Sequence, residues 1–236
     1  MLRDQNTKDH SLRNFIVSFN EKDYPPINVR IAPLKTFMHE HSKEEYSWAR
    51  LNKDKCPCCP LNENRYCPAA ISIASVLNPF RNYFSIESVT IEAEDRVGRK
   101  TFWTTDLQTA LFTLIRTAMF FSGCPVTEEF RIFLEDLRPL ATEKEIHKAL
   151  VIRFLLAYKG EKKIAKVEIN KRISDLHCIN LSLAKRICSN TKGDAIINSL
   201  VHADAVGLLL AINFDEIYQE ICDEINTIEQ SRIMHK

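Results

Sequence analysis

The sequence is poor in glycine, with five glycines among 236 residues. Neither G-x-G-x-x-G nor G-x-x-x-x-G-K-[ST] occurs in it, and these are the glycine-rich patterns whose backbone N–H groups surround phosphates. A charge excess is also missing, since 32 basic and 31 acidic residues leave a formal net charge of +1. These absences argue against a nucleotide-binding loop. They argue equally against binding of nucleic acid through overall charge.

Long apolar runs are absent as well. The longest one, Ala110 to Phe121, is interrupted by Arg116 and is shorter than the roughly 20 residues that a membrane-spanning helix needs. The first ten residues are polar and lack the apolar segment of a signal peptide. We therefore expect a cytoplasmic protein with no membrane partner. Thiols stay reduced in the cytoplasm, so clustered cysteines there indicate metal ligands or redox groups before disulfides.

The composition, 45% hydrophobic and 27% charged, is that of a chain that buries a core. We predict an α+β fold in a single domain covering residues 1–236. A small antiparallel sheet in the sheet-rich half, residues 10–104, is expected to pack on a mostly helical half, residues 105–231.

Alternating apolar and polar residues predict the strands of that sheet. Two strands are expected at Arg13–Phe19 and Ile27–Ala32, on either side of a proline-containing turn. Residues 89–94 and 99–104 form a second predicted hairpin around the turn at residues 95–98.

Helices are predicted from apolar spacing and from their end signals. A helix is expected to begin at Pro68 and to be stopped by Pro79, and an amphipathic helix from Thr105 is expected to end at Gly123 and Pro125. Residues 149–158 are nearly all apolar and predict a central buried helix. An apolar stripe from Phe214 to Ile228 predicts a last helix. Three capping boxes are predicted at Thr105 with Gln108, Thr142 with Glu145, and Asn213 with Glu216.

Four of the eight cysteines fall within twelve residues, between Cys56 and Cys67. Cys56 and Cys59 are two residues apart in a turn restricted by Pro57 and Pro60, as in a metal-binding knuckle. Cys67 follows at the start of the predicted helix. A closed tetrahedral site needs a fourth ligand, for which Cys124 in its Gly-Cys-Pro turn is the first candidate and Cys58 the local alternative.

Zinc is the metal we expect on such a set, with an iron–sulfur cluster as the alternative. The remaining cysteines, Cys178, Cys188 and Cys222, each lie alone in a helical pattern and are interpreted as small apolar residues. The histidine pair His39 and His41 is interpreted as part of a polar loop. The neighbours of His177 and His202 suggest no catalytic group, so no catalytic or cofactor-binding residue is predicted.

Several short motifs occur in an order that resembles an uncharacterised bacterial family, known as a domain of unknown function with CPxCPL, CPxA and SGCP cysteine motifs. The matching segments are Trp48–Leu51, Cys56–Leu61, Tyr66–Ala70, Leu107–Gln108 and Ser122–Pro125. The resemblance spans Phe15 to Tyr158, and more weakly residues 194–228. It supports grouping Cys124 with Cys56, Cys59 and Cys67, and it implies no activity. The family pattern also contains a histidine, and the corresponding residues 135–142 of this chain lack it.

These patterns favour a non-enzymatic cytoplasmic protein with a structural four-cysteine metal site that acts by binding another protein or by regulation, and the resemblance implies a bacterial one. Homo-oligomerisation is compatible with the same patterns. The alternative function is a metal- or thiol-based sensor or redox protein, which would use an iron–sulfur cluster or a reversible disulfide.

Overall fold

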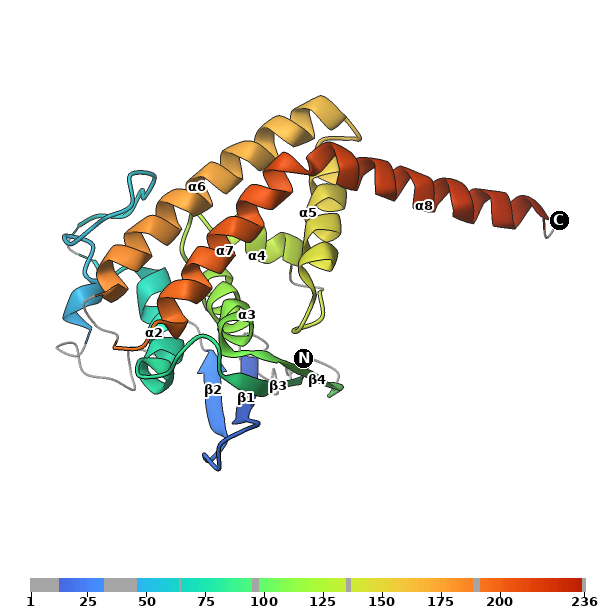
Figure 1. Ribbon diagram of the computed structural model, residues 1–236. Coiled ribbons are helices and arrows are strands. Elements are labelled where there is room, and N and C mark those ends of the chain that lie inside the picture. Colours follow the sequence, from blue (N-terminus) through green and yellow to red (C-terminus); the bar gives the residue numbers. More distant parts are fainter. Residues whose placement is uncertain are drawn as a thin grey trace, which may run out of the picture.

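The computed structural model of the chain describes residues 13–31, 46–63, 65–94, 98–134, 137–188 and 192–234 (Figure 1). The strands are β1 Arg13–Phe19, β2 Ile27–Ile31, β3 Ser88–Glu94 and β4 Lys100–Asp106. The helices are η1 Ser47–Ala49, α2 Pro68–Phe80, α3 Leu107–Phe120, α4 Glu128–Leu134, α5 Glu143–Ala157, α6 Lys162–Cys188, α7 Ala195–Ile212 and α8 Phe214–Met234.

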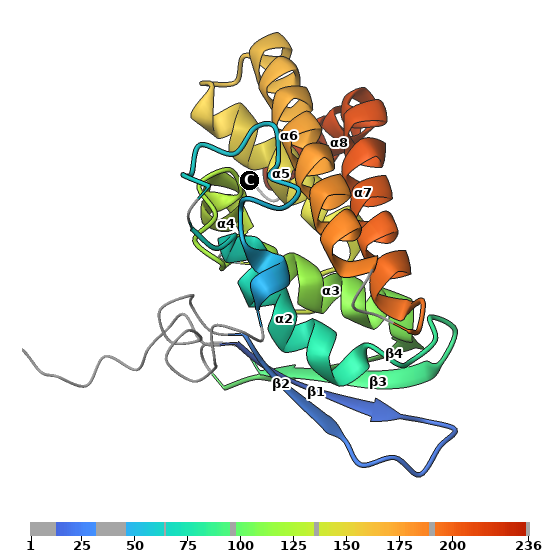
Figure 2. The same ribbon diagram turned by 90° about the vertical axis from the view of Figure 1, so that its left-hand side faces the viewer.

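The four strands form one antiparallel sheet in the order β2-β1-β3-β4. Phe15, Val17 and Phe19 of β1 are buried, whereas the residues between them face away from the core. Figure 2 shows α2 and α3 lying over one face of the sheet, with the longer helices above them. The predicted α+β class is thus confirmed, and so are the strands predicted from alternation. Buried residues of both halves join one hydrophobic core.

Helix α3 is the central element, and its start differs from the prediction. Its N-cap is Asp106, whose side chain accepts a hydrogen bond from the Thr109 N–H at 2.8 Å. The predicted capping box at Thr105 and Gln108 is wrong, because Thr105 is still paired with Val89 in the sheet. Strand β4 continues to Asp106, which pairs with Ser88 and is also the N-cap, so Thr105 lies one residue too early to cap the helix.

The end signals of the other helices have mixed outcomes. The capping box of Thr142 and Glu145 is confirmed, and Asn213 directly precedes α8 as expected, although its side-chain cap stays a prediction. Pro68 begins α2, whereas Pro79 lies inside the last turn of that helix.

Helix α5 does not have the central, buried position that its apolar sequence suggested. It buries four side chains, but Ile152 is 39% exposed and Leu156 is 69% exposed. The helix packs on α4, α6 and α8 and leaves its remaining face outside these contacts.

Within the described residues, one helix, α7, is long and apolar enough by composition to cross a membrane, with a mean hydropathy of 1.8 over 18 residues. Core helices of globular proteins meet the same criterion. Helix α7 packs against α3 and α6, and Ser199 Oγ donates to the Gln108 carbonyl at 3.0 Å.

The capping box of α5 generates a pH-dependent prediction. Hydrogen bonding to Arg138 is the main cause that lowers the pKa of Glu145 to about 2 from 4.5. A lowered carboxyl pKa stabilises the fold above pH 4.5, and this contribution is lost as the pH falls towards 2. Because the pair is partly solvated, we expect Glu145→Gln to cost about 1 kcal/mol at neutral pH.

Urea unfolding across this pH range measures the effect. The difference between wild type and Glu145→Gln should shrink as the pH falls, while Glu229→Gln on the exposed part of α8 should show no such trend. A constant difference at all pH values would contradict the assignment.

Candidate functional site

The cysteine-rich loop is closed at its base by backbone hydrogen bonds. The Leu51 N–H donates to the Arg65 carbonyl at 2.9 Å, and the Cys67 N–H donates to the Ala49 carbonyl at 2.7 Å. An isolated bridge joins Arg50 to Tyr66 between them. Residues 51–65 therefore form a loop whose two ends are held together, directly before α2.

Cys56 and Cys59 lie within this loop in a tight turn. The Cys59 N–H donates to the Cys56 carbonyl at 3.0 Å, as expected for a knuckle that brings residues i and i+3 together. Cys56 is buried, and Cys59 is partly buried against the core.

Cys67 and Cys124 occupy the ends of two core helices. Cys67 is the N-cap of α2, and Cys124 lies in the turn between α3 and α4. This turn is ordered by its own polar groups, because the Cys124 N–H donates to Ser122 Oγ at 3.1 Å and the Thr127 N–H donates to the Cys124 carbonyl at 3.1 Å. Both cysteines are buried.

These four cysteines, distant in sequence, lie near enough to influence one another electrostatically. Burial raises the pKa of Cys56, and the neighbouring thiols of Cys59 and Cys124 add to the rise. Burial likewise raises the pKa of Cys67 to about 11, with further contributions from Cys124 and Cys56. The predicted set thus gathers where the loop, the start of α2 and the end of α3 meet.

Groups that favour the thiolate also surround the set. The Cys124 pKa is raised by burial, and the backbone N–H groups of Val126 and Thr127 oppose this rise. The Ala70 N–H acts in the same way on Cys67. Hydrogen bonds and positive charge stabilise the charged form of a thiol, which is the form that binds a metal.

The positive charge comes from Arg186 of α6, which the sequence interpretation missed. This arginine is only 3% exposed, and it opposes the pKa rise of both Cys56 and Cys67. Its guanidinium donates to the carbonyl of Arg50 at 2.9 Å and to that of Asp54 at 3.0 Å. One feature of the sequence could have indicated this buried arginine, because Arg186 lies between Leu183 and Ile187 on the apolar side of α6.

Cys58 faces a different neighbour from the other loop cysteines. Its Sγ lies 3.8 Å from the Asp175 carbonyl of α6. Burial raises its pKa to about 11, and Cys56, Asp175 and Cys178 add to the rise. Cys58 is therefore oriented towards α6.

All eight cysteines are free thiols. Across the described ranges, no group of three or more Cys, His, Asp or Glu side chains is arranged to hold a metal ion. The four predicted ligands gather in one region without closing around one point. Their assignment as metal ligands stays a prediction.

Two histidines pair with acidic residues that lie on other helices and not next to them in the sequence. His177 Nδ1 lies 2.8 Å from Asp204 Oδ2, across the contact of α6 with α7, and His202 Nε2 lies 2.6 Å from Glu143 Oε1. Sequence reasoning missed both pairs, because each joins separate helices. His39 and His41 lie outside the described residues.

Comparisons with known proteins identify a family and no closer relative. No curated protein and no solved structure matches this sequence. A family model described as "Domain of unknown function (DUF6901)" matches residues 14–228. That match extends over nearly all the described elements, beyond the segment where the motif resemblance was strongest. The bacterial origin and the cysteine motifs of the resembled family stay predictions. The chain belongs to the family Domain of unknown function (DUF6901).

Proposed function

We propose that this chain is a non-enzymatic cytoplasmic protein that binds another protein through α8, and that a zinc ion on Cys56, Cys59, Cys67 and Cys124 stabilises its fold. The observation that carries the binding function is the apolar seam of α8, which continues past the helix's last contacts with the other helices. The gathering of the four cysteines supports the zinc site.

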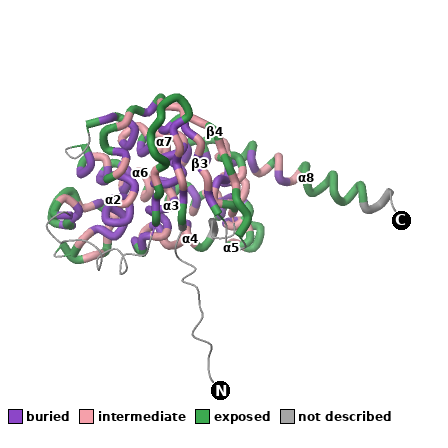
Figure 3. Tube along the Cα trace, turned by 90° about the horizontal axis from the view of Figure 1, so that it is seen from below, coloured by how far each residue is buried: buried purple, intermediate pink, exposed green. Residues whose placement is uncertain are grey.

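The α8 seam has the spacing of a coiled coil. Phe214, Tyr218, Ile221, Ile225 and Ile228 follow one another at intervals of four, three, four and three residues. Phe214 is fully buried and Ile221 is 7% exposed, whereas Ile225 and Ile228 are 50% and 53% exposed. Figures 1 and 3 show the C-terminal part of α8 extending away from the rest of the described chain. A seam of this kind is typical of a helix that pairs with another helix.

The charges on α8 favour a basic partner. Near the helical core, Glu220 lies 3.0 Å from the Lys144 Nζ of α5, and Lys148 also pairs with Glu220 and Glu224. Beyond these pairs, two acidic residues, Asp223 and Glu229, lie along the exposed part of the seam, and no basic residue occurs there before Arg232. A second copy of α8 would place acidic groups against acidic groups. We therefore propose that the partner presents a basic amphipathic helix.

The zinc proposal rests on the type of ligand and on what surrounds it. Four thiolates are a common ligand set of structural zinc, and zinc binding displaces thiol protons, which reverses the effect of burial on the pKa. Arg186 and the N–H groups near Cys67 and Cys124 would stabilise the resulting negative charge. In the described residues the four sulfurs are not arranged around one point, so zinc binding requires a rearrangement of these side chains. The raised thiol pKa values of Cys56, Cys58 and Cys67 disfavour a reactive redox thiol in the metal-free protein.

Cys124→Ser tests the zinc site, because Cys124 joins the end of α3 to the loop. We expect about one zinc per wild-type chain by elemental analysis. The variant should lose most of this zinc and unfold at a markedly lower denaturant concentration, since binding of a structural zinc contributes on the order of 10 kcal/mol to folding.

Two further variants make the zinc test specific. Cys188→Ser, at an exposed position of α6, should keep zinc and stability, and Cys58→Ser should do the same if Cys58 is not a ligand. Full zinc content in Cys124→Ser would contradict the ligand set. Visible colour with bound iron, or a metal-free protein with a reversible disulfide, would favour the sensor or redox alternative.

The double variant Ile225→Ser with Ile228→Ser tests the binding surface. Its stability should match that of wild type, because both side chains are half exposed. The probe is a synthetic helical peptide with leucine at its seam positions and lysine at the flanking ones. We expect wild type to bind it in calorimetry, more weakly at high salt, and the double variant to lose binding.

A matched control is Ile164→Ser with Val167→Ser, which removes exposed apolar groups from α6 and should leave peptide binding unchanged. Equal binding by both double variants, or no binding by wild type, would contradict the proposal. A wild-type dimer that the α8 substitutions dissociate would assign the surface to a second copy.

A further inference from the structure

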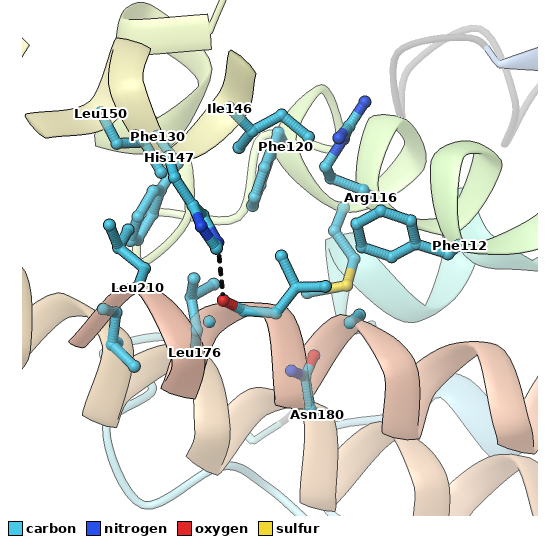
Figure 4. A pocket seen from close by; sticks show the side chains of 15 residues that line it. Phe112, Arg116, Phe120, Phe130, Ile146, His147, Leu150, Leu176, Asn180 and Leu210 are labelled. Atoms are coloured by element: carbon cyan, nitrogen blue, oxygen red, sulfur yellow. Dashed lines mark hydrogen bonds between the residues drawn. The ribbon is translucent and has the colours of Figure 1, made fainter. Parts of the chain in front are cut away.

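A cavity of about 50 Å³ lies among the helices, apart from the cysteines. Helices α3, α4, α5, α6 and α7 all contribute to its walls, which are mostly apolar (Figure 4). Three polar side chains interrupt this lining, and they are Arg116, His147 and Asn180. A mostly apolar cavity with a few polar groups is the usual form of a small-molecule site.

Arg116 of α3 is the most unusual of the three. Its Nη1 is buried and has no hydrogen-bond partner among the residues that the structure describes. The guanidinium lies 5.2 Å from the centre of the Phe112 ring, at the edge of the cavity (Figure 4). Burial lowers the pKa of Arg116 to about 10, so the group is still a cation at neutral pH. Glu143 is an anion close enough to oppose this fall of the pKa, but within the described chain the buried Nη1 still lacks a hydrogen-bond partner, and a bound anion would supply one.

Asn180 and His147 define the polarity of the remaining wall. Asn180 Nδ2 donates to Asp204 Oδ1 at 3.2 Å, whereas the buried Asn180 Oδ1 has no partner within the described part of the chain. His147 Nε2 lies 2.9 Å from the Val206 carbonyl, and burial lowers the pKa of His147, which favours the neutral ring. Arg116 is therefore the cation that borders the cavity.

Gly207 in the interior of α7 adds an independent observation. A Cβ built at this position would meet only Ile173 Cγ2, at 3.7 Å, which is an ordinary contact. Alanine would therefore fit here and would also favour the helix. The glycine keeps open space in the cavity wall that the packing of the protein itself does not require.

We propose that this cavity binds a small carboxylic acid, with its carboxylate on Arg116 and its apolar body among the helices. Guanidinium and carboxylate form strong charge-assisted hydrogen bonds, which would satisfy the buried Nη1. The cavity is larger than the roughly 10–15 Å³ that one water needs and smaller than the about 150 Å³ that holds benzene. The part of the apolar body that the cavity encloses is therefore a chain of a few carbon atoms.

Calorimetric titration with a series of straight-chain acids, from acetate to octanoate, tests this proposal. Affinity should rise with chain length, reach a maximum at a short chain and then fall as the cavity is filled. Primary alcohols of the same lengths should bind at least about tenfold more weakly than the acids, because they lack the charge that pairs with Arg116.

Arg116→Met distinguishes an arginine that binds the ligand from one that only supports the fold. The variant should lose the preference for acids over alcohols, while its ligand-free melting temperature should not fall, since a buried Nη1 without a hydrogen-bond partner among the described residues is removed. Arg30→Met, at an exposed position of β2, should change neither quantity. A lower melting temperature with unchanged acid binding would overturn the proposal.

Gly207→Ala is the second variant, and it decides the outcome even if Arg116→Met fails to fold. The added methyl group should weaken acid binding several-fold without lowering the melting temperature. Acid binding at wild-type strength in this variant, or no binding of any acid to wild type at millimolar concentrations, would overturn the proposal.

Discussion

The fold depends above all on the burial of α3 on nearly every side. Eleven of the 14 side chains of this helix are buried, and it packs against α2, α4, α7 and the sheet. A helix enclosed in this way cannot shift without opening the core, so whatever lies along it is fixed in place. Its first residue follows directly from β4, its last turn leads to Cys124, and Arg116 lies between. Both the candidate metal site and the cavity therefore take their geometry from α3.

The second constraint is the attachment of the cysteine-rich loop to the helices. In its described residues the loop contains no helix or strand, and backbone hydrogen bonds at its base hold its two ends together. Arg186 supplies a link from α6 by donating to two carbonyls of the segment. A metal on the four cysteines would add a link to α2 and to the end of α3. The site would then be filled by protein ligands, which is the arrangement of structural zinc and leaves no position for a substrate.

The sequence predicted those features that depend on local patterns. Alternation located the strands, and the Thr142–Glu145 pair located a helix start, because each pattern involves residues that are close along the chain. Predictions failed where a distant partner decided the outcome: Thr105 stays in the sheet because it pairs with Val89, and α5 exposes Leu156 because its neighbours cover only one face. The buried arginines Arg116 and Arg186, and the pair of His177 with Asp204, required the packing of separate helices and had no local signal of comparable strength. The sequence suggested that Cys124 lies near the loop cysteines. It does not determine whether the four sulfurs surround one metal ion.

The central claim is that Cys56, Cys59, Cys67 and Cys124 together bind one zinc ion. X-ray absorption at the zinc edge of the purified protein tests it most directly, because this measurement reports the type, number and distance of the ligand atoms. Our account predicts a first shell of four sulfur atoms at about 2.3 Å, with no nitrogen or oxygen. A shell containing nitrogen or oxygen ligands, or a folded protein that binds no zinc at all, would contradict it.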